Sequence, residues 1–113
     1  MSGSPEEARL AQRGPRDITL FSRPGCHLCE EAKTAIAPLL CEFGAVLHEV
    51  NIDEDATLKE RFGFDIPVIY IGPHKAAKHR VELGQFRRQL QQAMQSDLHA
   101  GNFSNKKANF NGP

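Results

Sequence analysis

The chain has 113 residues, of which 40% are hydrophobic, and its fourteen basic and fourteen acidic side chains give a net charge of zero. A chain of this length forms one compact domain, and the balanced charge excludes a global field that would attract nucleic acid or anionic lipid. Residues 1–16 lack the apolar stretch of a signal peptide, and no later segment approaches the roughly eighteen apolar residues of a membrane span. We therefore expect a cytoplasmic monomer that binds neither nucleic acid nor membrane.

The first half of the chain predicts a strand, a helix and a second strand. Residues 17–22 are apolar and β-branched and end at a proline and a glycine, as strands do before a loop. From residue 26 to about residue 42 apolar side chains recur at helical spacing, and Pro38 predicts a bend in this helix without ending it. Residues 45–52 are the second predicted strand. A helix between two strands of one sheet makes those strands parallel.

The second half predicts a short helix, a hairpin and a last helix. The short helix follows acidic capping candidates and runs through residue 62, and strand 66–71 has a proline near its start, where a missing N–H is tolerated. Residues 72–75 are the predicted turn, residues 77–81 the fourth strand, and a last helix begins near residue 83. The predicted fold class is therefore α/β, with a mixed four-stranded sheet in the order β-α-β-α-β-β-α flanked by helices.

The two ends of the chain differ from its middle. Residues 1–16 are polar and are predicted to be a flexible N-terminal segment. Residues 99–113 show no periodicity and contain many turn-forming residues, so we predict a disordered C-terminal tail. The single domain is expected to span residues 17–98.

Cys26 and Cys29 are the candidate catalytic residues. A Cys-x-x-Cys that leaves a strand and opens a helix exposes its first sulfur to free backbone N–H groups and to the positive end of the helix dipole, which favours the thiolate of Cys26. Cys29 lies three positions later on the same helix face, close enough for a disulfide. Arg23 would add positive charge if it reached over the loop.

The segment 20–29 (LFSRPGCHLC), together with 64–68 (FDIPV), resembles the glutaredoxin-like branch of the thioredoxin superfamily over about residues 17–98. The resemblance implies a thioredoxin-like fold in which Cys26 attacks a disulfide and Cys29 resolves the mixed disulfide. Glutathione is then a candidate co-substrate, and no tightly bound cofactor is expected.

The same resemblance implies roles for three further residues. Pro67 would follow a cis peptide bond and face the cysteine pair, Ile66 would pair its backbone with glutathione or a substrate peptide, and Arg23 would hold a glutathione carboxylate. The family's Thr-Val-Pro is here changed by Asp65, and the usual Gly-Gly before the last helix is replaced at residues 82–85. These departures weaken the assignment of glutathione and leave disulfide exchange unaffected.

The predicted function is a thiol-disulfide oxidoreductase that reduces protein or glutathione mixed disulfides. Two alternatives use the same cysteines differently: a metal or iron-sulfur binding module completed by glutathione or a second subunit, and a thioredoxin-fold adaptor without catalysis.

The remaining cysteine and the histidines give no metal site. Cys41 lies about 18 Å along the helix axis from Cys29 at 1.5 Å per residue, too far to share a metal, and is predicted to be buried. His27 is predicted to face solvent, and His48 to be partly buried with a hydrogen-bond partner. The other three histidines are predicted to lie on the surface, in a turn, an edge strand and the tail: His74, His79 and His99.

Overall fold

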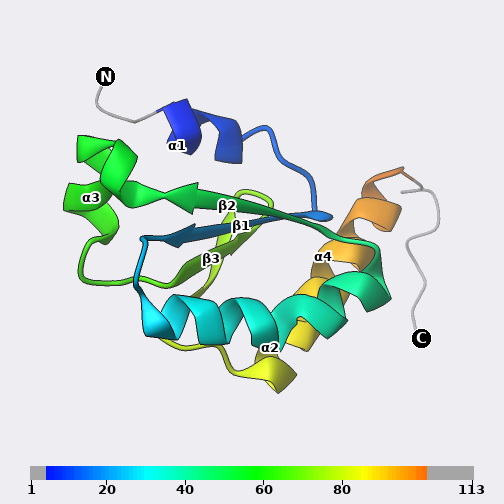
Figure 1. Ribbon diagram of the computed structural model, residues 1–113. Coiled ribbons are helices and arrows are strands. Elements are labelled where there is room, and N and C mark those ends of the chain that lie inside the picture. Colours follow the sequence, from blue (N-terminus) through cyan, green and yellow to red (C-terminus); the bar gives the residue numbers. More distant parts are fainter. Residues whose placement is uncertain (1–4, 102–113) are drawn as a thin grey trace.

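The computed structural model describes the backbone of residues 5–101 and the side chains of residues 8–95, and it confirms the mixed four-stranded sheet. The strand order is β2-β1-β3-β4, with β1 parallel to β2 and antiparallel to β3, and with β3 and β4 antiparallel (Figure 1). The elements in chain order are α1 (Pro5–Leu10), β1 (Asp17–Ser22), α2 (His27–Phe43), β2 (Val46–Asn51), the 3-10 helix η1 (Ile52–Glu54), α3 (Ala56–Phe62), β3 (Val68–Ile71), β4 (His74–Lys78) and α4 (Leu83–Gly101).

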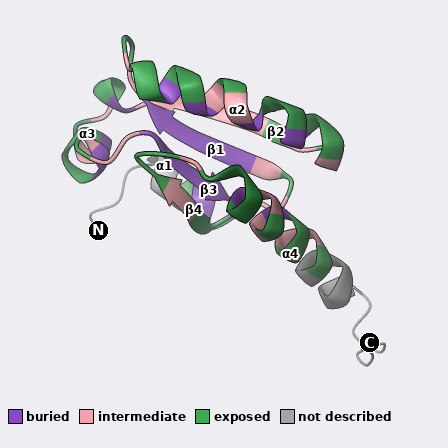
Figure 2. Ribbon diagram, turned by 90° about the horizontal axis from the view of Figure 1, so that it is seen from below, coloured by how far each residue is buried: buried purple, intermediate pink, exposed green. Residues whose placement is uncertain are grey.

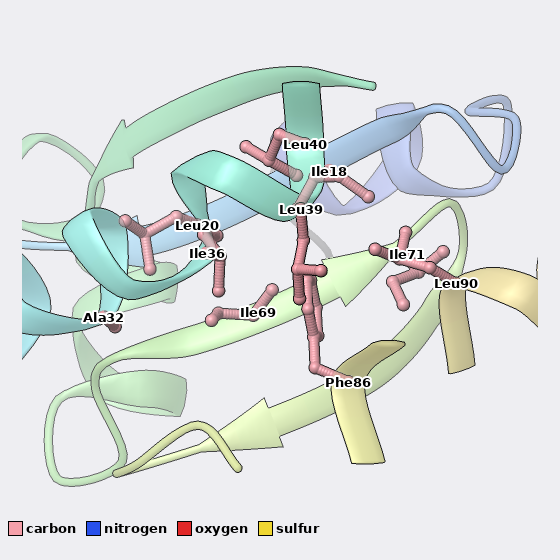
Figure 3. Close-up of a cluster of buried hydrophobic side chains, with 10 residues drawn as sticks. All are labelled: Ile18, Leu20, Ala32, Ile36, Leu39, Leu40, Ile69, Ile71, Phe86 and Leu90. Carbon is pink, nitrogen blue, oxygen red and sulfur yellow. The ribbon is translucent and has the colours of Figure 1, made fainter. Parts of the chain in front are cut away.

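Helices cover both faces of the sheet, α2 and α4 on one face and α1 and α3 on the other (Figure 1). Since successive side chains of a strand point to opposite faces, β1 and β3 contribute to both interiors, and Figure 2 shows these two central strands largely buried. The interior beneath α2 and α4 is aliphatic except for one phenylalanine. It consists of Ile18, Leu20, Ala32, Ile36, Leu39, Leu40, Ile69, Ile71, Phe86 and Leu90 (Figure 3).

The opposite interior contains three aromatic rings. Phe21 stacks on Phe62 with ring centroids 4.6 Å apart, and Tyr70 meets Phe21 edge-on at 5.7 Å. Leu10 belongs to the same cluster and is only 7% exposed. Residues 5–10, which the sequence analysis assigned to a flexible segment, thus form a helix, α1, whose Leu10 packs on the aromatic cluster.

The last strand of the hairpin, β4, begins earlier in the chain than the sequence pattern predicted. Ile71 pairs with His74, so the turn contains only Gly72 and Pro73, and β4 spans residues 74–78 instead of 77–81. Gly72 has φ of 58°, which allows so short a turn. β3 starts at Val68 and not at residue 66, since the preceding proline has no N–H to donate to a ladder.

Both long helices extend slightly past their predicted ends. α2 continues through Pro38, as predicted, and ends before Gly44. α4 is described to Gly101, so His99 lies in this helix and not in a tail. The rest of the predicted tail, residues 102–113, lies outside the described residues. No helix in the described part of the chain combines the length and apolar character that a membrane crossing requires.

Replacing Leu10 with alanine should lower the free energy of unfolding by about 2 kcal/mol, since a buried leucine loses its apolar contacts and leaves a cavity. Leu83→Ala is the matched control, because Leu83 is 42% exposed and its truncation should change stability by less than about 1 kcal/mol. Chemical denaturation of both variants measures the difference. Equal losses would show that α1 does not contribute to the core.

Candidate active site around the cysteine pair

Three segments meet at one edge of the sheet because of how β1 is paired. Ser22, at the end of β1, is opposite Asn51 at the end of the parallel strand β2. Phe21 is opposite Val68, the first residue of the antiparallel strand β3. The loops that follow β1 and β2 and the loop that precedes β3 therefore leave from the same edge (Figure 1). These loops contain nearly all of the residues predicted for the site.

A tight turn connects β1 to α2. The Cys26 N–H donates to the Arg23 carbonyl at 3.2 Å, with Pro24 and Gly25 between them. Gly25 has φ of 80°, and proline followed by a left-handed glycine is the signature of a type II turn. The turn delivers Cys26 to the N-cap position of α2, in an extended conformation with φ of −82° and ψ of 106°.

Cys26 and Cys29 form a disulfide, with 5.2 Å between their Cα atoms. Cys29 is only 1% exposed, whereas Cys26 is half-buried and can be reached from solvent. The Cys29 N–H donates to Sγ of Cys26 at 3.1 Å, so the sulfur acts as the capping group of α2. A thiolate at Cys26 would accept the same hydrogen bond. The pair thus joins one partly exposed cysteine to one buried cysteine.

The peptide bond between Ile66 and Pro67 is cis, as the family resemblance implied. Pro67 is buried, and the backbone N–H of His79 donates to the carbonyls of Pro67 at 2.8 Å and Asp65 at 3.0 Å. These two bonds connect the end of β4 to the cis-proline loop. The Ile66 N–H donates to the Phe62 carbonyl at 3.2 Å, a bond that any substrate backbone paired there would have to replace.

Arg23 is held by Asp53. Its Nε and Nη2 both donate to Oδ1 of Asp53, at 3.1 and 2.8 Å, and this hydrogen bond keeps the pKa of the Asp53 carboxyl below its usual value. The sequence interpretation treated Asp53 only as a helix-capping candidate. The parallel pairing of the first two strands could have revealed the contact, because an acid just after the second strand must lie near a base just after the first.

Carboxylates also contact the other basic side chains of this segment. His27 is exposed, as predicted, and its Nε2 lies 3.1 Å from Glu31. Lys33 contacts Glu49 at 3.0 Å and Glu30 at 3.5 Å, and the hydrogen bond to Glu49 raises the pKa of Lys33. The basic side chains on the first turns of α2 are therefore all in contact with carboxylates.

Other sequence-predicted residues lie away from the pair. Cys41 is exposed, and the prediction of burial is wrong, because it follows Leu40 by one residue and so points off the helix face that meets the sheet.

His48 is half-buried, as predicted, and its Nε2 lies 3.0 Å from Oδ1 of Asp17. This hydrogen bond lowers the pKa of Asp17. His74 and His79 are exposed. Within the described residues no group of three or more His, Cys, Asp or Glu side chains is arranged to hold a metal.

Comparison with known protein families agrees with this geometry. A model of the family described as Glutaredoxin-like domain (DUF836) matches residues 17–91 of the chain. The chain belongs to this glutaredoxin-like family. The match runs from β1 into α4 and includes the cysteine pair and the cis-proline loop. The mixed sheet with its flanking helices is accordingly the thioredoxin-like fold.

Individual relatives point the same way. The "Glutaredoxin-like protein YDR286C homolog" of Dictyostelium discoideum is 33% identical over 72 residues, which are 58% of this chain and 67% of that protein. Protein XcR50 of X. campestris is 28% identical, with a TM-score of 0.56 over 67% of this chain and 97% of its own. A buckwheat glutaredoxin in complex with glutathione shares the fold at 18% identity, with a TM-score of 0.52 over 79% of this chain and 86% of its own.

Replacing Gly25 with alanine should cost roughly 1 to 2 kcal/mol of stability, because an L-residue is strained at φ of 80° although the added Cβ meets no atom within 4 Å. Gly14→Ala is the control, since its Cβ also meets nothing within 4 Å and its backbone is not left-handed. Denaturation of the oxidised proteins measures both effects. Equal stability of the two variants would contradict the turn assignment.

Proposed function

We propose that this chain is a thiol-disulfide oxidoreductase that reduces protein or glutathione mixed disulfides through Cys26 and Cys29. The observation that carries the proposal is the unequal burial of the two joined sulfurs, with Cys26 accessible at the helix N-terminus and Cys29 covered. Attack on a substrate requires one accessible thiol, and release of the product requires a second thiol within reach of it. Both come from one chain, so the proposal needs neither a bound cofactor nor a second subunit.

The proposed reaction proceeds in two exchanges. The Cys26 thiolate attacks one sulfur of the substrate disulfide, forms a mixed disulfide and expels the other sulfur as a thiolate, which takes a proton from solvent. The Cys29 thiolate then attacks the Cys26 sulfur and expels the second substrate thiol. Two electrons have passed to the substrate, and the chain is left with the Cys26–Cys29 disulfide. Two molecules of an external thiol such as glutathione then attack in turn and leave as their disulfide, which returns two electrons to the pair.

The helix end alone can activate Cys26. Lowering a thiol pKa by two units requires about 2.7 kcal/mol of preferential stabilisation of the thiolate. A helix N-terminus contributes roughly 0.3 to 1 kcal/mol, and a hydrogen bond to a charged group about 1.5 to 3 kcal/mol. The Cys29 N–H already bonds the Cys26 sulfur at 3.1 Å. These two contributions together reach the required size without Arg23.

Protein disulfides are supported as substrates by exposed apolar side chains near the pair. Leu28, between the cysteines, is 42% exposed, and Phe64, just before the cis-proline loop, is 94% exposed. Apolar groups left in solvent beside a reactive site provide contact area for a macromolecular partner. Ile66 and Pro67 would present the backbone that pairs with such a substrate. Glutathione is the first small co-substrate to test, because a neighbour with this fold is a glutathione complex.

Cysteine variants test the proposal. The reduced wild type should reduce a protein mixed disulfide, and Cys26→Ser should lower the rate at least about a hundredfold because the attacking group is missing. Cys29→Ser should accumulate a mixed disulfide on Cys26 that mass spectrometry detects. Cys41→Ser is the matched control and should react like the wild type, since Cys41 lies exposed near the far end of α2.

Alkylation with iodoacetamide as a function of pH should give a Cys26 pKa below the free value of about 8.5. A Cys26 pKa at or above the free value, or full activity of Cys26→Ser, would contradict the proposal. Zinc or visible absorption in the purified protein, lost in Cys26→Ser, would favour the metal-binding alternative instead.

A further inference from the structure

The cation next to Cys26 in the chain is already bound by a carboxylate. Arg23 begins the turn that ends at Cys26, so their Cα atoms are within about 7 Å of each other. Its guanidinium donates twice to one oxygen of Asp53, from the loop after β2. Both side chains remain partly exposed, at 34% and 40%, so the pair is accessible from solvent.

The neighbouring cations do not replace this charge. His27 and Lys33, on the first turns of α2, contact carboxylates as well. Lys78 and Arg80 lie at and after the end of β4, two strands away from β1 and hence about 10 Å across the sheet. The Arg23–Asp53 ion pair is therefore a charge-compensated group next to the turn that carries Cys26.

A compensated pair acts on substrates differently from a free guanidinium. A free cation attracts any anion over several ångströms, whereas the field of an ion pair falls off faster with distance and changes sign with direction. Glutathione and its disulfide are net anions at neutral pH. Charge near a binding surface acts chiefly on encounter rates and on selection among partners.

We propose that Asp53 is a specificity-determining residue of the cysteine site, because it compensates the Arg23 charge and thereby disfavours anionic disulfides relative to neutral and cationic ones. This inference rests on the proposed disulfide exchange at Cys26. It assigns Asp53 no contact with the reacting sulfurs. Asp53 acts through Arg23, and the expected consequence is a change in substrate selection and not in the chemistry of exchange.

Three small disulfides of different charge separate these effects. The reduced full chain is mixed with glutathione disulfide (anionic), hydroxyethyl disulfide (neutral) or cystamine (cationic), and formation of the Cys26–Cys29 disulfide is followed at low salt. Asp53→Asn should raise the rate with glutathione disulfide about fivefold, lower the rate with cystamine by a similar factor, and leave the neutral disulfide within about twofold. Physiological salt should reduce both changes.

Glu54→Gln is the matched control, because it removes the same charge one residue further along, from an exposed side chain that does not bond Arg23. Its effect on the three rates should be under about twofold, since Glu54 makes no hydrogen bond to the cation beside the cysteine turn. Arg23→Gln should do the reverse and lower the rate with glutathione disulfide relative to cystamine, because it leaves the Asp53 charge uncompensated. The unchanged neutral rate also shows that the variant is folded and its cysteines reactive.

The inference is wrong if Asp53→Asn and Glu54→Gln change the ratio of anionic to cationic rates equally, or if Arg23→Gln leaves that ratio unchanged. A wild type that oxidises with none of the three disulfides contradicts the proposed function itself. The two failures are thus distinguishable in one set of measurements.

Discussion

The pairing of β1 with a parallel strand on one side and an antiparallel strand on the other controls what can meet at this site. β2 ends where β1 ends, and β3 begins there, so three loops distant in sequence start from one edge of the sheet. A shift of β1 by one residue would exchange the faces of Leu20 and Phe21 and would move Arg23 relative to Asp53. The packing of the core and the geometry of the site consequently depend on the same register.

The Cys26 sulfur has a structural role as well as a chemical one. At the start of most helices, a side-chain oxygen of the N-cap residue accepts a hydrogen bond from the backbone N–H two or three residues further along the chain. In α2 the sulfur of Cys26 is this acceptor. A thiol is a weak acceptor, whereas a hydrogen bond to an anion is much stronger. The N–H of Cys29 therefore completes the helix end and favours the reactive form with one contact. Gly25 matters because its left-handed turn brings the sulfur to that N–H.

Local patterns were sufficient to predict β1 and α2, because an alternating or helical apolar pattern determines which side of an element is buried. The cis bond before Pro67 followed only from family resemblance, since sequence itself favours trans. The predictions failed where the burial of a side chain depends on a neighbouring element or on its exact position around the helix axis. Leu10 is a lone leucine in a polar segment, and its burial depends on the aromatic cluster beneath α1. Cys41 follows the buried Leu40 by one residue, and that single step turns it to solvent.

Arg23 shows a second limit of sequence-based prediction. The local sequence pattern identified this residue but not its contact with Asp53. A basic side chain before a reactive cysteine suggests free positive charge, and only the parallel register of β1 and β2 shows that Asp53 already compensates it. The guanidinium has five N–H donors in a rigid fork, and Asp53 engages those on Nε and Nη2 through one oxygen. Donors therefore remain for a second carboxylate. These donors are available to contact a substrate carboxylate, although the Arg23–Asp53 pair carries no net charge to attract one, so contact and attraction have to be considered separately for this residue.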